Sequence, residues 1–171
     1  MAAYEKAGES DEWYTPKFIF DALGLVFDVD VASPPEGPRY VTARQFIAWN
    51  SLQTRWDGLV WMNPPFGHQR TKRAWLSKFF EHGNGIALVP DRTSAPWFQE
   101  MAQKAEVMCF LNGKVKFERP NGTVGKSPGT GTVLVSAGKV ARNALLNSGL
   151  GFCVEKVRGE TDGNASTNSG S

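Results

Sequence analysis

Four consecutive residues, Asn63-Pro64-Pro65-Phe66, carry the groups of this chain that are best suited to chemistry on a planar amine. The Asn63 amide oxygen can accept a hydrogen bond, and Pro64 keeps a carbonyl oxygen whose direction is restricted by the fixed φ of proline. Phe66 offers a flat ring on which another ring can stack. Two acceptors beside an aromatic ring suit a planar amine such as the 6-amino group of adenine.

The amino nitrogen of adenine is a poor nucleophile because its lone pair is delocalised into the ring. If Asn63 and Pro64 accept its two hydrogens, the nitrogen becomes more tetrahedral and its lone pair can face an electrophile. Such positioning can contribute on the order of 7–11 kcal/mol at best. The alternative is a structural turn, because Asn-Pro often begins turns. The place of the tetrapeptide, directly behind an apolar strand-like run, favours the functional interpretation.

Two further groups of residues have types that suit the binding of a nucleoside cofactor. Tyr14-Thr15-Pro16 begins a predicted helix, with Thr15 as the N-cap and Pro16 as the first helical residue. A helix amino end attracts anionic groups such as a carboxylate, although a capped helix start explains the same residues. Asp28 and Asp30 lie on the next predicted strand, and acids at a strand's carboxyl end often bind hydroxyls or amines. Asp30 is the better candidate, because Asp28 is equally well explained as part of a solvated face.

The elements that must position these residues alternate between strand and helix along the chain. Apolar periodicity and punctuation by Gly and Pro predict strands over residues 27–31, 58–62, 86–90, 107–111 and 151–155. Helices are predicted over residues 16–23 and 71–82, from residue 94 onward, and over residues 140–147. Residues 114–118 and 132–136 read as antiparallel additions, and residues 39–57 give no clear pattern. This order predicts an α/β fold with a mostly parallel sheet.

Length and composition restrict the class of protein. The 171 residues suffice for one domain, expected over residues 11–157, with a loose leader over 1–10 and a disordered tail over 158–171. We expect no membrane span and no secretory signal, and therefore a cytoplasmic protein. Cys109 and Cys153 lie in apolar runs and are expected to fill the core. With two histidines in the chain, no metal site is expected.

The net charge of +2 hides an uneven distribution along the chain. Residues 1–36 contain eight acidic and two basic side chains, whereas residues 37–171 contain 17 basic and 9 acidic ones. A basic body can bind a polyanion, and a solvated surface of uneven charge is the alternative.

The motifs, taken in order and spacing, resemble the phage-type DNA N-6-adenine methyltransferases, which use S-adenosylmethionine. The resemblance runs from Asp11 to about Val135 and rests on the following segments: Asp11-Glu12-Trp13-Tyr14-Thr15-Pro16, Phe27-Asp28-Val29-Asp30-Val31-Ala32, residues 56–66 with the Asn-Pro-Pro-Phe tetrapeptide, Leu88-Val89-Pro90-Asp91-Arg92-Thr93 with Trp97-Phe98, and Gly113-Lys114-Val115-Lys116-Phe117. It implies a Rossmann-like methyltransferase fold, S-adenosylmethionine as cofactor and double-stranded DNA as partner. The implied setting is the cytoplasm of a bacterium or of a phage-infected host, with restriction–modification as one context.

The resemblance also implies roles for individual residues. Asn63, Pro64, Pro65 and Phe66 match the catalytic Asp/Asn-Pro-Pro-aromatic motif, and Asn63 would also border the cofactor. Tyr14, Thr15 and Pro16 look like the segment that contacts the cofactor in related enzymes, and Asp30 lies in the position of the first cofactor motif. The glycine-rich turn that usually follows this motif is missing, and Ser33-Pro34-Pro35 stands in its place.

A base inside a duplex is out of reach, so the adenine must be rotated out of the stack. The candidates for DNA phosphate contacts are Arg70, Lys72, Arg73, Arg92, Lys114 and Lys116. Three alternatives stay open on the sequence: methyl transfer to RNA, methyl transfer to a protein glutamine amide, and a non-catalytic DNA-binding module. The recognition sequence, the oligomeric state and the presence of a restriction partner are not determined by the sequence.

Overall fold

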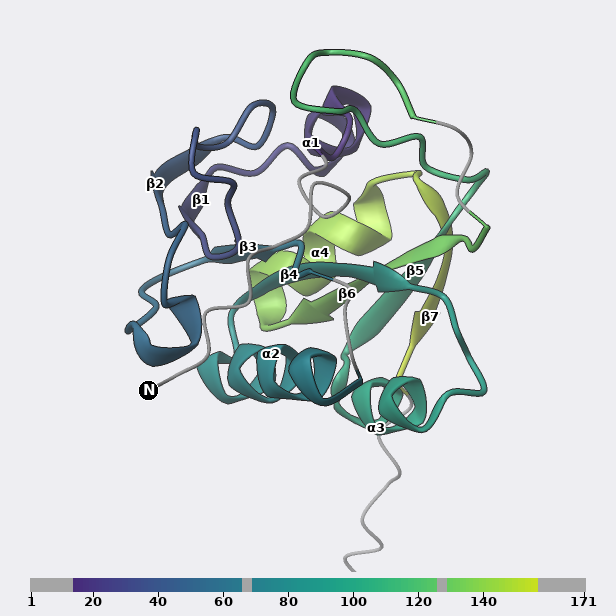
Figure 1. Ribbon diagram of the computed structural model, residues 1–171. Helices are drawn as coiled ribbons and strands as arrows, with labels where there is room; N and C mark the ends of the chain where they lie inside the picture. Colours follow the sequence, from purple (N-terminus) through teal and green to yellow (C-terminus); the bar gives the residue numbers. More distant parts are fainter. Residues whose placement is uncertain (1–13, 66–68, 126–128, 157–171) are drawn as a thin grey trace, which may run out of the picture.

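The computed structural model of the chain describes residues 14–65, 69–125 and 129–156 (Figure 1). The expected leader over residues 1–10 and the expected tail over 158–171 lie outside the described residues. Phe66, the aromatic residue of the tetrapeptide, lies outside them as well.

A seven-stranded sheet forms the centre of the molecule, with strands in the order β2-β1-β3-β4-β6-β5-β7. The strands are β1 Phe27–Asp30, β2 Ala43–Phe46, β3 Val60–Met62, β4 Gly85–Pro90, β5 Val107–Leu111, β6 Thr132–Ala137 and β7 Gly151–Glu155. β2, β1, β3 and β4 are parallel neighbours, whereas β6 and β7 are antiparallel to the strands beside them. The predicted α/β fold, with parallel N-terminal strands and antiparallel C-terminal additions, is confirmed.

Helices cover both faces of this sheet and produce two apolar cores. The helices are α1 Lys17–Leu23, α2 Gln69–His82, α3 Pro96–Lys104 and α4 Lys139–Asn147. α2 and α3 pack on one face, where Phe79 and Met101 join the core with Met62 of β3. α1 and α4 pack on the other face, where Ile19 and Leu145 are fully buried. β4 and β6 are buried along their whole length, as strands covered on both faces should be.

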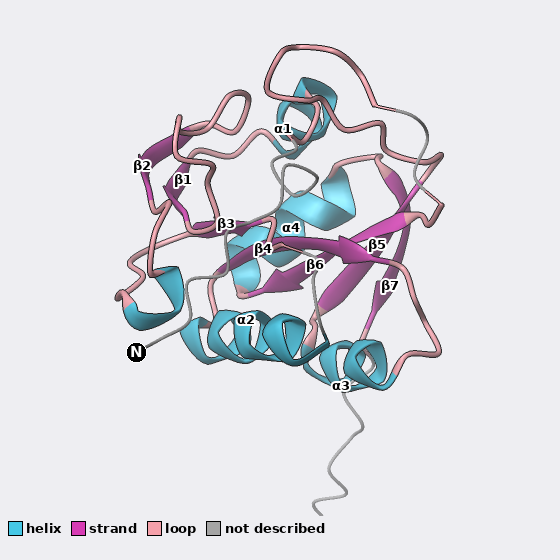
Figure 2. Cartoon of the chain, in the orientation of Figure 1, coloured by secondary structure: helices cyan, strands magenta, loops and turns pink. Residues whose placement is uncertain are grey.

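The structure differs from the sequence-based expectations for the strands at three places. β2 lies in the stretch over residues 39–57 that gave no pattern, because as an edge strand it is mostly exposed and lacks an apolar alternation. β3 begins at Val60 rather than at residue 58, since Gly58 has a φ of +71° that a strand does not contain. Residues 114–118 form no strand, and the described part of the β5–β6 connection is a loop (Figure 2).

Within that loop, Glu118 forms isolated antiparallel bridges with Tyr14 and with Val124. The loop is thereby attached to the segment that enters α1, not to the edge of the sheet. None of the helices in the described ranges is long and apolar enough to span a membrane.

Candidate active site

The two polar residues Asp30 and Asn63 lie at the point where the order of the parallel strands reverses. β1 has β2 on one side and β3 on the other, so the chain leaves β1 in one direction and returns across it to form β3. Open α/β sheets bind ligands outside the carboxyl ends of the strands at such a point. Asp30 is the last residue of β1 and is paired with Trp61 of β3, two residues before Asn63. The sheet therefore brings the two residues to the same edge.

The Asn-Pro-Pro segment leaves the sheet directly behind a strand that is buried on both faces. Val60, Trp61 and Met62 are all buried, and the prolines that follow have no N–H to continue the ladder. Pro64 is buried, while Asn63 and Pro65 are partly exposed at the edge. The structure thus describes both proposed acceptors, whereas stacking on Phe66 stays a prediction outside the described residues.

The Asn63 amide is held by the residue that precedes Pro16. Asn63 Nδ2 donates a hydrogen bond to Thr15 Oγ1 over 3.2 Å. This bond uses the amide nitrogen and leaves the amide oxygen to accept from another group. The hydroxyl hydrogen of Thr15 can at the same time be donated elsewhere, because a hydroxyl both accepts and donates.

The prediction that Thr15 caps α1 is wrong. The N-cap residue is Pro16, with an extended ψ of 150° and no side-chain cap bond, and the helix begins at Lys17. Thr15 is only 6% exposed and directs its hydroxyl toward Asn63 instead. Sequence reasoning assigned the Thr15 hydroxyl a local partner, since a hydroxyl before a helix gives no sign of a partner 48 positions away.

Asp30 is the buried acid of the site. It is 5% exposed, and its Oδ1 accepts the Ala32 N–H over 3.2 Å. Burial raises the pKa of Asp30 to about 7, which the backbone hydrogen bond only partly opposes. A carboxyl in this state can ionise when a cationic or hydroxyl-bearing ligand arrives.

Asp28 has a different role, although it lies two residues earlier on the same strand. Its Oδ2 accepts the Leu59 N–H over 2.7 Å, and Arg44 lies 3.4 Å from its Oδ1. A Cβ on Gly58 would come within 2.2 Å of the same Oδ2. Asp28 therefore fixes the turn that enters β3, at the amino-terminal half of β1.

Sequence reasoning missed an aromatic residue at this edge. Phe46 ends β2, is paired with Asp30 and is 47% exposed. One edge of its ring lies against Gly37, where a Cβ would be 3.2 Å from the nearest ring atom. The loop that replaces the glycine-rich turn is attached here too, because Ser33 N donates to Ile47 O over 3.1 Å. A lone Phe in an unpatterned stretch carries no signal that could have found it.

The basic residues predicted to contact DNA fall into groups with different partners. Arg73 donates twice to Glu100 of α3, over 3.0 and 2.9 Å, so its charge is largely satisfied within the protein. Lys72 lies over the Trp97 ring at 5.2 Å. Partial burial lowers the pKa of Lys72, and the nearby charge of Arg92 lowers it further. Lys72 and Arg92 therefore form a close pair of cations.

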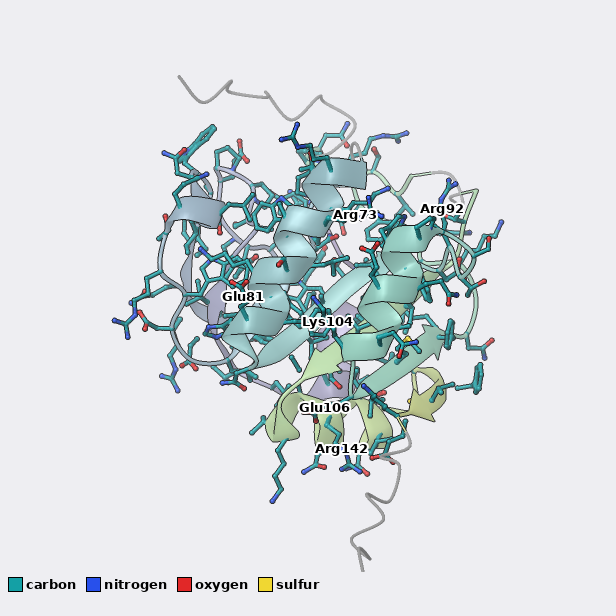
Figure 3. All side chains as sticks on the ribbon, turned by 90° about the horizontal axis from the view of Figure 1, so that it is seen from below. Arg73, Glu81, Arg92, Lys104, Glu106 and Arg142 are labelled. Atoms are coloured by element: carbon teal, nitrogen blue, oxygen red, sulfur yellow. The ribbon has the colours of Figure 1, made fainter. Side chains whose placement is uncertain are left out.

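The position of these cations agrees with the edge that holds Asp30 and Asn63. Figure 3 shows Arg73 and Arg92 together at one end of the α2–α3 face, with Lys104 and Glu106 toward the other end. Arg92 follows β4, so this end corresponds to the carboxyl ends of the parallel strands.

The remaining predicted DNA contacts are exposed side chains. Arg70 is exposed in the first turn of α2. Lys114 and Lys116 are exposed on either side of the buried Val115, so the expected alternation is present without a strand. All three side chains reach solvent, although Lys114 Nζ also donates a long hydrogen bond of 3.5 Å to Gly129 O.

The described residues contain no group of three or more His, Cys, Asp or Glu side chains that could hold a metal ion. Comparison with curated proteins and with solved structures found no match. The model of one protein family, described as DNA N-6-adenine-methyltransferase (Dam), matches residues 3–145. This match covers most of the chain, including Asp30, Asn63 and the basic residues. The chain therefore belongs to the DNA N-6-adenine-methyltransferase (Dam) family and is an adenine-specific DNA methyltransferase.

Proposed function

We propose that this enzyme methylates the 6-amino group of adenine at the carboxyl edge of β1 and β3, with Asn63 and Pro64 as the groups that hold the amine. The observation that carries the proposal is the hydrogen bond from Asn63 Nδ2 to Thr15 Oγ1 at the point where the strand order reverses. This bond supports an orientation in which the amide oxygen is available as an acceptor. An asparagine suffices here, since the site needs an acceptor and not a negative charge.

The residues of the chain act by positioning. Asn63 Oδ1 and the Pro64 carbonyl accept the two amine hydrogens, which localises the nitrogen lone pair toward the methyl donor. S-adenosylmethionine, the cofactor that membership of the family implies, supplies the methyl group from its sulfonium. Transfer would exchange the sulfur–carbon bond of the cofactor for a nitrogen–carbon bond, and the amine held by Asn63 and Pro64 would release its surplus proton to solvent. Neither a covalent enzyme intermediate nor a strong general base is needed.

The residues around Asp30 fit a nucleoside cofactor that carries an amine and a sulfonium. Asp30 offers a buried carboxyl whose pKa of about 7 would fall beside a cation, and Thr15 offers a hydroxyl. Tyr14 and Pro16 flank that hydroxyl, as the family resemblance suggests. We add Phe46 to this set, because it is paired with Asp30 and is 47% exposed, and an aromatic ring in that position can support a planar base.

Duplex DNA is the proposed substrate, bound through its phosphates by Arg70, Lys72, Arg92, Lys114 and Lys116. Arg73 belongs to the same group by position, but its bonds to Glu100 argue for a smaller contribution. The target adenine is extruded into the site, at a cost of a few kcal/mol that phosphate and pocket contacts must offset. We place the activity in the cytoplasm of a bacterium or a phage-infected host, the setting of the enzymes that the motifs resemble.

Replacement of Asn63 by alanine tests the proposal. We expect kcat to fall on the order of 10²–10³-fold, as for loss of one preorganised polar group, with little change in DNA affinity. Transfer of labelled methyl groups to unmethylated plasmid gives kcat, and sequencing for methyladenine gives the recognition site. Asn147→Ala, at the exposed end of α4, is the matched control. Turnover within twofold of native in Asn63→Ala would refute the assigned role.

A further inference from the structure

Glu118 connects three segments that are distant in the sequence. Its backbone pairs with Tyr14 in both directions, with N–O distances of 2.8 and 3.0 Å. Its side chain accepts from Arg39 Nη1 over 2.8 Å at one oxygen and from the Tyr40 hydroxyl over 2.7 Å at the other. Both carboxylate oxygens are therefore used inside the protein, although the residue lies in a long loop.

Arg39 completes this arrangement, which we call the Glu118 clamp and define as Tyr14, Arg39, Tyr40 and Glu118. The Arg39 guanidinium lies over the Tyr14 ring at 4.0 Å. It also donates to the carbonyl oxygens of Arg119 over 3.1 Å and of Pro120 over 2.7 Å. The Arg39 and Glu118 side chains are 29% and 18% exposed, so their ion pair is shielded more than an ordinary surface pair.

The clamp ends one residue away from the site. Tyr14 precedes Thr15, whose hydroxyl accepts the hydrogen bond from Asn63. The helix that follows cannot fix Thr15 by capping, because Pro16 is the N-cap and makes no side-chain cap bond. Thr15 is thus held from its amino side through Tyr14, which pairs with the Glu118 backbone and carries on its ring the Arg39 guanidinium that the Glu118 carboxylate fixes.

We propose that Glu118 is a positioning residue for methyl transfer, which holds Tyr14 and Thr15 so that the Asn63 amide presents its oxygen to the adenine amine. This inference rests on the proposed role of Asn63. It assigns to a loop residue, 55 positions beyond Asn63, control over the orientation of the amide. Lys116 lies on the same loop two residues earlier, so a phosphate contact there acts on an element already tied to the site.

The first experiment compares Glu118→Ala and Glu118→Gln with the native enzyme. We expect kcat to fall about tenfold in Glu118→Ala, the effect of losing one charge-assisted hydrogen bond, with KM for DNA within about twofold. Glu118→Gln keeps two polar atoms for Arg39 and Tyr40 and should recover most of the loss. The matched control is Glu155→Ala, whose partner Arg142 ties α4 to β7. A native kcat in Glu118→Ala, or an equal loss in Glu155→Ala, would overturn the inference.

A double-mutant cycle separates positioning from a general structural effect. Thr15→Val removes the hydroxyl but keeps the shape, so in that background Glu118→Ala should lower kcat by less than about twofold. Thr15→Ser, which keeps the hydroxyl, should preserve the response to Glu118→Ala. If the Glu118→Ala loss is the same with and without the Thr15 hydroxyl, the residue does not act through Thr15. Should Glu118→Ala fail to fold, Arg39→Lys and Tyr40→Phe replace it in the same cycle, with the same two outcomes.

The two proposals fail in distinguishable ways. Native turnover in Asn63→Ala removes the role of Asn63 and this inference with it. A large loss in Asn63→Ala together with native turnover in Glu118→Ala removes this inference alone.

Discussion

Polar side chains are buried in both halves of the sheet, but they are satisfied differently in the parallel and in the antiparallel half. In the antiparallel half, Ser136 of β6 accepts the Val107 N–H over 3.0 Å and donates to the Val107 carbonyl over 3.4 Å. In the parallel half, the Asp30 carboxyl accepts one backbone N–H and has a pKa raised to about 7. Ser136 is a closed structural contact, whereas Asp30 keeps a capacity for a further partner.

We interpret this difference as a division of the sheet between a half that stabilises the fold and a half that carries the proposed chemistry. The antiparallel strand β6 lies between β4 and β5 and is bonded along both edges, so it stabilises the centre of the sheet. The parallel strands end at an edge that holds Asp30 and Asn63, with Thr15 bonded to Asn63, and none of these side chains is fully satisfied by the bonds described. Thr132 is an exception, because it belongs to the antiparallel strand β6 but lies at the carboxyl edge of the parallel strands. It begins β6 opposite Pro90, at the carboxyl end of β4. Its buried Oγ1 has no hydrogen-bond partner among the described residues.

The largest effect that we predict is a loss of stability, without a loss of activity, from a substitution in the antiparallel half. Leu134 of β6 is fully buried, so Leu134→Ala should lower the free energy of unfolding by about 2–5 kcal/mol. The kcat of the molecules that remain folded should be unchanged, because no contact of the site is touched. Urea unfolding and active-site titration measure the two quantities. Leu146→Ala, at a 38% exposed position on α4, is the control. If kcat per folded molecule fell along with the stability, the antiparallel half would not be purely structural, and the proposed division between the two halves of the sheet would be wrong.

In the parallel half, Asp30→Asn should have the opposite effects: the protein should become more stable, and its function should be impaired. The folded carboxyl keeps its proton up to about pH 7, whereas the unfolded chain releases it near the ordinary value of 3.8. Between these values the unfolded state binds fewer protons, so the free energy of unfolding of the native chain falls as the pH rises, and levels off above pH 7. Asp30→Asn should remove this fall and be more stable at pH 8, by at most about 4 kcal/mol. Urea unfolding at pH 4.5 and 8 measures it.

The Asp30→Asn substitution should also weaken the binding of the cofactor. We expect affinity for S-adenosylmethionine, measured by calorimetry, to fall about tenfold or more with loss of a charged acceptor. In the native enzyme this affinity should rise with pH through about 7, as Asp30 ionises. Asp57→Asn, at an exposed position, is the control and should keep both native pH dependences. Unaltered cofactor affinity in Asp30→Asn would place the cofactor elsewhere.

The sequence predicted the parts of the site that are encoded locally. The Asn-Pro-Pro segment behind an apolar strand, and an acid at the end of the preceding strand, could both be placed from pattern alone. The choice of Asp30 over Asp28 as the functional acid stays a prediction, and the bond of Asp28 to Leu59 explains why a spacing rule could not separate them.

Partners distant in the sequence could not be predicted in the same way. Thr15 looked like a helix cap because its true partner, Asn63, meets it only in the folded sheet. Residues 114–118 alternate like a strand, but Glu118 pairs with Tyr14 instead of a sheet edge. β2, with Phe46 at its end, was hidden because an exposed edge strand needs no apolar pattern. Membership of the DNA N-6-adenine methyltransferase family, by contrast, was predicted from the order and spacing of the motifs and is confirmed by the family match.

The two buried hydroxyls of β6 offer a smaller test of the same division. Ser136→Ala leaves the Val107 N–H and carbonyl without their partner and should cost about 1–3 kcal/mol of stability. Thr132→Val replaces a hydroxyl without a described partner by a methyl group and should add about 1 kcal/mol. Both variants should keep native kcat, measured beside their urea unfolding curves. A fall in kcat in Thr132→Val would assign its hydroxyl to the catalytic edge and move the boundary between the two halves.

The smallest expected effect concerns the cations at the catalytic edge. Arg92→Gln should lower DNA affinity about threefold and reduce the slope of log K against log salt by about 1, as for loss of one phosphate contact. Arg73→Gln should change the slope by less, because Glu100 already holds that guanidinium. Lys104→Gln, at the opposite end of the α2–α3 face, should leave it unchanged (Figure 3). Fluorescence anisotropy at several salt concentrations measures all three. Equal slopes for the Arg92 and Lys104 variants would mean that DNA approaches another face. The cations at the carboxyl edge of the parallel strands would then not be the phosphate contacts.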